Sequence, residues 1–170
     1  MTTFKSISLS ITLLFVALSC KSNRYSFLDN YEKKTTPIVD STNFSNHVEK
    51  TLLNNEERQL LSLDSIFVGQ LNQNNVKIGI SYVPEISDKF TSIVYYFYAN
   101  SNELSAILVN YNQNHKVIDY QLIAYDEIAE AMLKTTGTIY NDRIVLKEYI
   151  SDNPSTIIFD ILENGTITRH

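Results

Sequence analysis

The chain of 170 residues contains one cysteine and only four glycines. A single cysteine excludes both an intrachain disulfide framework and a metal site built from several thiolates. The glycines form no phosphate-binding loop, no GxSxG elbow and no EF-hand loop. The three histidines show no HExxH or paired spacing, so the sequence predicts neither a metal site nor a cofactor.

Positive charge is also scarce. The chain has 14 Lys and Arg against 19 Asp and Glu, a formal net charge of −5. Proteins that bind nucleic acid normally carry a basic surface that meets the phosphates, so no nucleic-acid partner is expected. A hydrophobic fraction of 44% is enough for one sizeable core, and the length suits one monomeric domain.

The first nineteen residues have the layout of a secretory signal. A single charge, Lys5, precedes an apolar segment at 7–18, which is too short to span a bilayer comfortably. Ser19 and Cys20 follow directly. We therefore expect residues 1–19 to be a signal peptide, with cleavage between Ser19 and Cys20. The alternatives are an ordinary signal peptide with a chance cysteine, or an uncleaved N-terminal anchor.

The run Ala17-Leu18-Ser19-Cys20 resembles a bacterial lipobox, in which a small residue precedes an invariant cysteine. The commonest lipobox has Leu where Ala17 stands and a small residue where Leu18 stands. The resemblance implies that the thiol of Cys20 carries a diacylglycerol and that the new amine carries a further chain such as palmitate. Chains that each contribute about 0.8 kcal/mol per buried CH₂ together hold a protein on a lipid bilayer.

Residues 20–44 are expected to form the lipidated cysteine and a flexible tether, because they mix polar residues and Pro37 without periodicity. Such a tether could extend roughly 65 Å from the lipid. No acidic cluster follows Cys20, unlike the run that resembles a surface-export tag in some Bacteroidota lipoproteins. We therefore expect a cell-envelope location, on the outer membrane and facing the periplasm.

A helix is predicted at 46–63, at the start of a single globular domain expected to cover residues 45–170. Asn46 and Glu49 have the spacing of a capping box. An apolar face recurs with a period of 3.6 residues through Val48, Leu52 and Leu60. The pair Asn54-Asn55 leaves open a division into two short helices.

From residue 66 onward the apolar period becomes two, and short separators rich in Asn, Asp and Gly divide the chain. Asn141-Asp142 and Asn164-Gly165 favour primed hairpin turns. Such short connections cannot hold crossover helices, so the strands must be antiparallel neighbours. The expected strands lie at 76–82, 91–98, 104–111, 117–125, 132–140, 144–150, 156–162 and 166–168.

These elements predict an α+β fold, in which the N-terminal helix packs on an antiparallel β-meander of about eight strands. A sheet of this length curls, so it would form either a curved sheet capped by the helix or a half-open barrel. The hairpin segments 111–119 and 164–167 resemble a pattern in small Bacteroidota lipoproteins. That resemblance covers about the last seventy residues and implies no particular activity.

Two groups of side chains are candidates for function. Tyr96 and Tyr98 alternate with Tyr95 and Phe97 in one predicted strand, so they share a face that could stack on a sugar or a partner protein. Cross-strand aromatic packing is the favoured explanation. A carboxylate cluster would suit glycoside hydrolysis, but a solvated strand end explains it better; its members are Asp119, Asp126, Glu127 and Glu130.

The sequence therefore predicts a membrane-anchored envelope lipoprotein with a binding or accessory role and no catalysis. Its partners would be the bilayer, through acylated Cys20, and a protein or glycan ligand. One alternative is an immunity-type protein that blocks a basic toxin in the envelope. A hydrolase that uses the carboxylate cluster is the third possibility.

Overall fold

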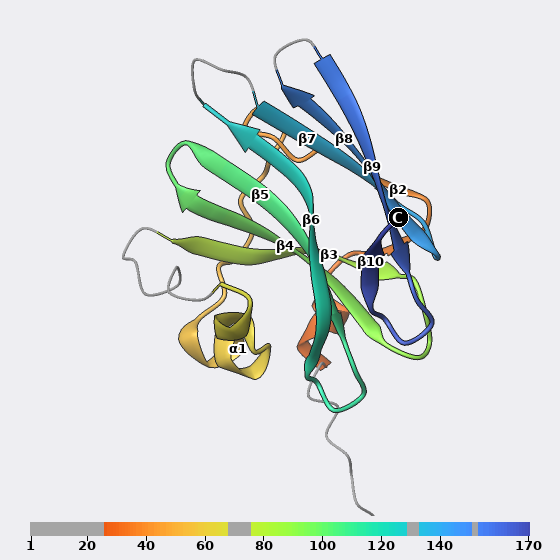
Figure 1. Ribbon diagram of the computed structural model, residues 1–170. Coiled ribbons are helices and arrows are strands. Elements are labelled where there is room, and N and C mark those ends of the chain that lie inside the picture. Colours follow the sequence, from red (N-terminus) through yellow and green to blue (C-terminus); the bar gives the residue numbers. More distant parts are fainter. Residues whose placement is uncertain (1–25, 68–75, 129–132, 151–152) are drawn as a thin grey trace, which may run out of the picture.

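The computed structural model describes residues 26–67, 76–128, 133–150 and 153–170 (Figure 1). The expected signal peptide at 1–19 and the expected lipidation site Cys20 lie outside the described residues. The strands are β1 (Lys33–Thr35), β2 (Ile38–Asp40), β3 (Lys77–Glu85), β4 (Thr91–Asn100), β5 (Glu103–Tyr111), β6 (Val117–Glu127), β7 (Leu133–Ile139), β8 (Arg143–Ile150), β9 (Asn153–Ile161) and β10 (Ile167–Arg169). The helical segments are η1 (Ser26–Asn30), α1 (Asn55–Leu60) and η2 (Leu63–Ser65).

The predicted α+β class is wrong. Strands account for 56% of the structure and helical turns for 10%, and all ten strands belong to one sheet. The expected helix at 46–63 is reduced to the six residues of α1. The protein is therefore mostly β, and no long N-terminal helix packs against the sheet in the part of the chain that the structure describes.

The short helix begins where the capping chemistry is complete. The side chain of Asn54 accepts a hydrogen bond from the amide of Glu57 at 3.0 Å, and the Glu57 carboxylate accepts one from the Asn54 amide at 2.8 Å. This is the capping box, eight residues later than expected. The Asn46 side chain instead accepts from the amide of Asn43 in a turn. The amide of Leu53 donates to the carbonyl of Ile78, so the chain before α1 is extended beside β3.

The predicted strands are present as β3 to β10, each paired antiparallel with the next along the chain. Their turns differ from the expected primed type. Among the described residues, positive φ occurs only at Ser62, His115 and Gly165. Asn164 and Asn141 therefore lack the left-handed conformation that a type I′ turn requires. Gly165 supplies a single left-handed residue after a turn at 162–165, as in hairpins closed by a bulge.

Residues 26–53 form a strap along the folded sheet, and we call this segment the N-terminal strap. Its strand β1 runs parallel to β3, and β2 pairs antiparallel with β7. The β2 strand has room there because β6 and β7 pair at only two positions, Tyr125 with Thr135 and Asp126 with Lys134. Residues 26–44 are therefore part of the domain. The prediction of a flexible tether at 20–44 and of a domain that starts at 45 is wrong for these residues.

Two hydrophobic cores lie on opposite faces of the central strands. The first joins β3, β4 and β5 to the helical segments, with Leu28, Leu61 and Tyr111 among its members. The second fills the space inside the bend of the sheet, where Ile38 of β2 meets side chains of β4 to β9 such as Ile123. Strands β4 and β5 are covered on both faces, and their sequences are therefore nearly continuous apolar runs.

Replacing Leu28 by Ala tests whether the strap belongs to the core. Leu28 is 5% exposed within the first core, and truncating such a side chain removes about 2–5 kcal/mol from the free energy of unfolding. The matched control is Val39→Ala, because Val39 lies in the same strap and is 72% exposed. Urea denaturation of both variants measures the difference. Equal stabilities would mean that the strap does not pack as described.

Candidate functional site

The predicted tyrosine face lies beneath the N-terminal strap. Tyr96 is fully buried, and its hydroxyl donates to the carbonyl of Lys50 at 2.6 Å. The ring of His47 packs on Tyr96 with the ring centroids 4.6 Å apart, and it meets the half-buried Tyr98 at 5.6 Å. Phe44 lies 6.0 Å from Tyr98. The strap therefore occupies the surface that a stacked ligand would need.

The environment of the His47 side chain favours the neutral form of its imidazole. Its Nε2 atom is buried and has no hydrogen-bond partner among the described residues. Burial lowers the pKa of His47 from its ordinary value, and the charge of Lys50 acts in the same direction. The carboxylates of Glu49 and Asp40 oppose the decrease in pKa. The contact with Tyr96 and Tyr98 is therefore made by a neutral imidazole near pH 7.

Asp40 is the buried charged residue of the described chain, with 4% exposure. Its carboxylate accepts a hydrogen bond from the Tyr82 hydroxyl at 2.7 Å and from the amide of Thr42 at 2.9 Å. Burial, together with the negative charge of Asp40, raises the pKa of Tyr82 well above its usual range. The Lys34 ammonium lies 4.3 Å from the centroid of the Tyr82 ring. These contacts fasten the end of β2 to β3.

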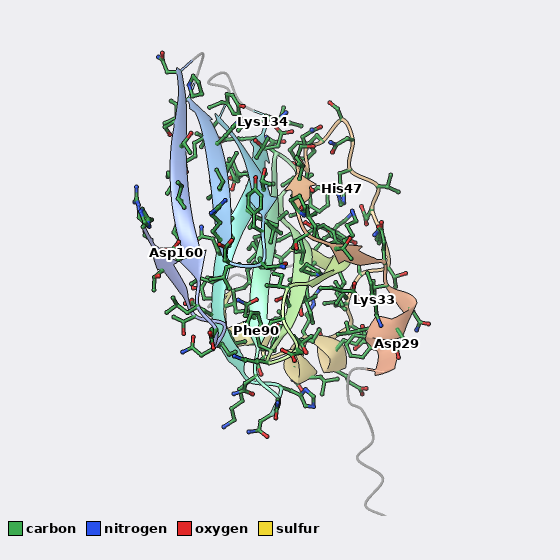
Figure 2. All side chains as sticks on the ribbon, turned by 90° about the vertical axis from the view of Figure 1, so that its right-hand side faces the viewer. Asp29, Lys33, His47, Phe90, Lys134 and Asp160 are labelled. Atoms are coloured by element: carbon green, nitrogen blue, oxygen red, sulfur yellow. The ribbon has the colours of Figure 1, made fainter. Side chains whose placement is uncertain are left out.

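A recess of about 310 Å³ opens beside this hydrogen-bonded pair, and we call it the strap pocket. Lys34 and Lys50 contribute two ammonium groups to its lining, while Asp40 lies in its wall. The Lys50 ammonium also donates to the carbonyl of Ser81. The remaining lining residues are Val39, Ser41, Thr42, Asn46, His47, Val48, Ser81 and Tyr82. Figure 2 shows His47 on the strap side of the molecule.

A second recess of about 650 Å³ lies beyond Lys50 and has an acidic lining. Its three carboxylates are already engaged. Glu57 closes the capping box of α1, Glu49 pairs with Lys77 at 3.2 Å, and Glu32 lies 3.7 Å from Lys34. The second recess therefore offers a cationic ligand few unengaged carboxylate oxygens. In the strap pocket Lys34 shares the ion pair with Glu32 and Lys50 donates to Ser81, but each ammonium has three donors and keeps capacity for a ligand, so the strap pocket is the better candidate site.

The predicted carboxylate cluster does not converge. Asp119 accepts a hydrogen bond from the amide of Ile167, and Asp126 accepts one from the amide of Phe44. Asp119 and Asp126 are seven residues apart on the same strand, which corresponds to roughly 23 Å. Glu127 follows at the end of β6, and Glu130 lies outside the described residues. Where the chain is described, no group of three His, Cys, Asp or Glu side chains could hold a metal ion.

Sequence reasoning missed the strap pocket because it assigned residues 34–42 to a tether and residues 46–50 to a helix. Asp40, Thr42 and Lys34 precede the region of clear alternation, and strands of three residues are too short to show a period. The alternation of β2, in which Ile38 and Asp40 are buried and Val39 is exposed, is visible only in the structure. The sequence Ile38-Val39-Asp40 does not alternate apolar and polar residues, so it carries no signal for a half-buried strand.

Comparison with models of protein families, with curated proteins and with solved structures found no match. Within the described ranges, no helix has the length and the apolar character needed to cross a membrane.

The lowered pKa of His47 predicts a loss of stability in acid. An unfolded histidine titrates near 6.5, so the neutral contact contributes its full stability above that pH. The contribution decreases as the pH falls from about 6.5 through the lowered pKa of the folded state. Urea denaturation between pH 8 and pH 5 measures the effect. His47→Phe keeps an aromatic ring at this position and should flatten the profile, whereas His170→Gln, at the exposed C-terminus, should not. An unchanged profile in His47→Phe would contradict the assignment.

Proposed function

We propose that the protein is a lipid-anchored protein of the bacterial cell envelope that binds a polar ligand in the strap pocket without converting it chemically. The position of Cys20 is the observation that supports the proposal of a lipid anchor. The only cysteine of the chain follows directly after the apolar segment at 7–18 and a small residue, Ser19. A signal peptidase product that begins with this cysteine would need no further membrane-inserting segment.

The arrangement of the strap pocket supports binding of a ligand with an anionic group. Lys34 and Lys50 supply ammonium donors at the pocket, and such donors form charge-assisted hydrogen bonds with carboxylates. The carboxylate of Asp40 is occupied by Tyr82 and Thr42. The hydroxyl groups of Ser41 and Thr42 suit a hydroxylated ligand. A sugar acid combines these two features and serves as the probe.

The other predicted partners fit this surface less well. A sugar held mainly by aromatic stacking would need a solvent-exposed aromatic side chain, whereas Tyr96 is fully buried and Tyr82 is 5% exposed. A basic toxin, the partner expected for an immunity-type protein, would meet two ammonium groups at the strap pocket. The anionic polar ligand is therefore the proposal that agrees best with the charges of this pocket.

Replacing Cys20 by Ser tests the anchor. The serine hydroxyl cannot accept the diacylglycerol, so cells grown with labelled palmitate should incorporate label into the wild-type protein and not into Cys20→Ser. The variant should remain uncleaved or soluble. Ser22→Cys in the Cys20→Ser background is the matched control, because it restores a thiol two positions after residue 20. Equal labelling of wild type and Cys20→Ser would contradict the proposal.

Glucuronate and glucose test the strap pocket as matched acidic and neutral probes. Glucuronate should cause saturable amide shifts at Ser41, Thr42 and Ser81 in nuclear magnetic resonance spectra, and glucose should not. Lys34→Gln should abolish these shifts. Lys33→Gln is the control and should leave the shifts in place, because Lys33 pairs with Asp29 at 3.2 Å and does not line this pocket. Shifts that survive in Lys34→Gln, or the absence of shifts with glucuronate, would contradict the proposed site.

A further inference from the structure

We infer that one end of the domain rests on the lipid headgroups while the opposite end cannot reach them; the inference depends on the lipid anchor proposed at Cys20. The described chain begins at Ser26 in η1, which lies at the lower end of the molecule in Figure 1 and close to α1. We call this the tether end. Its partner is the headgroup layer of the bilayer that holds the acyl chains of Cys20.

The tether end is defined by contacts that join several elements. Leu28 of η1, Leu61 next to α1 and Tyr111 at the end of β5 belong to the same core. The Tyr111 hydroxyl also donates to the carbonyl of Leu61 at 2.9 Å. Val117, at the start of β6, packs against this core. The tether end therefore contains η1, α1, η2 and the β5–β6 turn.

The far end is defined at the other end of β6. The amide of Ile128 donates to the carbonyl of Asn102 at 2.9 Å, so the β4–β5 turn lies there. Asp126 pairs with Lys134 of β7, and Leu133 pairs with Ile150 of β8. In Figure 2, Lys134 lies at the upper end of the molecule and Asp29 of η1 lies near the lower end.

The length of chain between the anchor and the domain limits the orientation. Cys20 and Ser26 are six positions apart in the sequence, which allows at most about 22 Å. The eleven residues of β6 run from the tether end to the far end and span roughly 33 Å. If the domain were inverted, Ser26 would stand farther from the lipid than the chain can reach. The domain can tilt, but its far end cannot face the bilayer.

The composition of the tether end indicates contact with headgroups rather than insertion. The exposed large hydrophobic residues of the described chain are Val39, Val48, Leu52, Tyr120, Ile128, Ile150, Ile158 and Leu162. Of these, Leu162 lies near the tether end, because the carbonyl of Gly165 in its turn accepts a hydrogen bond from Asn110 of β5. None of these exposed residues belongs to η1, α1 or η2. Charged side chains of both signs, such as Asp29 and Arg58, are present there instead. The acyl chains thus supply the insertion, and the protein surface meets the polar layer.

Energy transfer from two single-cysteine positions to the headgroups tests this orientation. Cys20 is acylated in the full-length lipidated protein, so an added cysteine is the free thiol for a fluorescent donor. Asp29→Cys reports the tether end and Ile150→Cys the far end; the side chain of Asp29 is 68% exposed and Ile150 is 61% exposed. The proteins are reconstituted in phosphatidylethanolamine and phosphatidylglycerol vesicles with an acceptor on the headgroups. Circular dichroism verifies that both variants fold.

Energy transfer should be about threefold or more stronger from residue 29 than from residue 150. The far end lies about 33 Å farther from the headgroups than the tether end does. Inserting twenty Gly and Ser residues after Arg24 extends the maximum reach to about 94 Å and should remove most of the difference. Equal or stronger transfer from residue 150 in acylated protein overturns the orientation alone. Failure to incorporate palmitate and to bind vesicles overturns the proposed anchor, and the orientation with it.

Discussion

The structure depends on covering three central strands on both faces. Strands β3, β4 and β5 carry apolar side chains toward two cores, so each face needs a partner layer to keep water away. The bend of the sheet brings β7, β8 and β9 against one face. η1, Leu53 and the helical turns cover the other face, whereas the middle of the N-terminal strap shares the face of β7 to β9, through Ile38 and through the contact of His47 with Tyr96. One segment thereby contributes to both cores and pairs with both halves of the sheet.

The hydrogen-bonded pair of Asp40 and Tyr82 fixes where the strap lies. A buried carboxylate is costly unless hydrogen bonds satisfy it, and Asp40 has two donors, one from β3 and one from its own loop. Beyond this point the chain passes over Tyr96 and makes contact through His47 and the carbonyl of Lys50. The strap pocket forms between these two attachments. The same contacts that hold the strap therefore position the lysines proposed to bind the ligand.

Local patterns in the sequence predicted the hairpin-linked strands, because alternation and turn residues act over a few neighbours. They failed where the outcome depends on distant partners. The apolar period at 46–63 resembled a helix, yet Leu53 pairs with β3 and the better cap lies at Asn54. Residues 33–40 looked like a tether because each strap strand is three residues long and finds its partner more than forty residues away. Tyr96 and Tyr98 share a face as expected, but no local signal revealed that the strap covers it.

Hydrogen exchange of the backbone amides tests most directly the claim that the strap is a structural part of the domain. Amides of β1 and β2, such as those of Lys34 and Val39, are to be compared with amides of β4 and β5 under native conditions. If the strap ties the two halves of the sheet together, both sets should exchange with opening free energies close to that of global unfolding. Strap amides that exchange at rates near those of an unfolded chain, while β4 and β5 remain protected, would contradict the account.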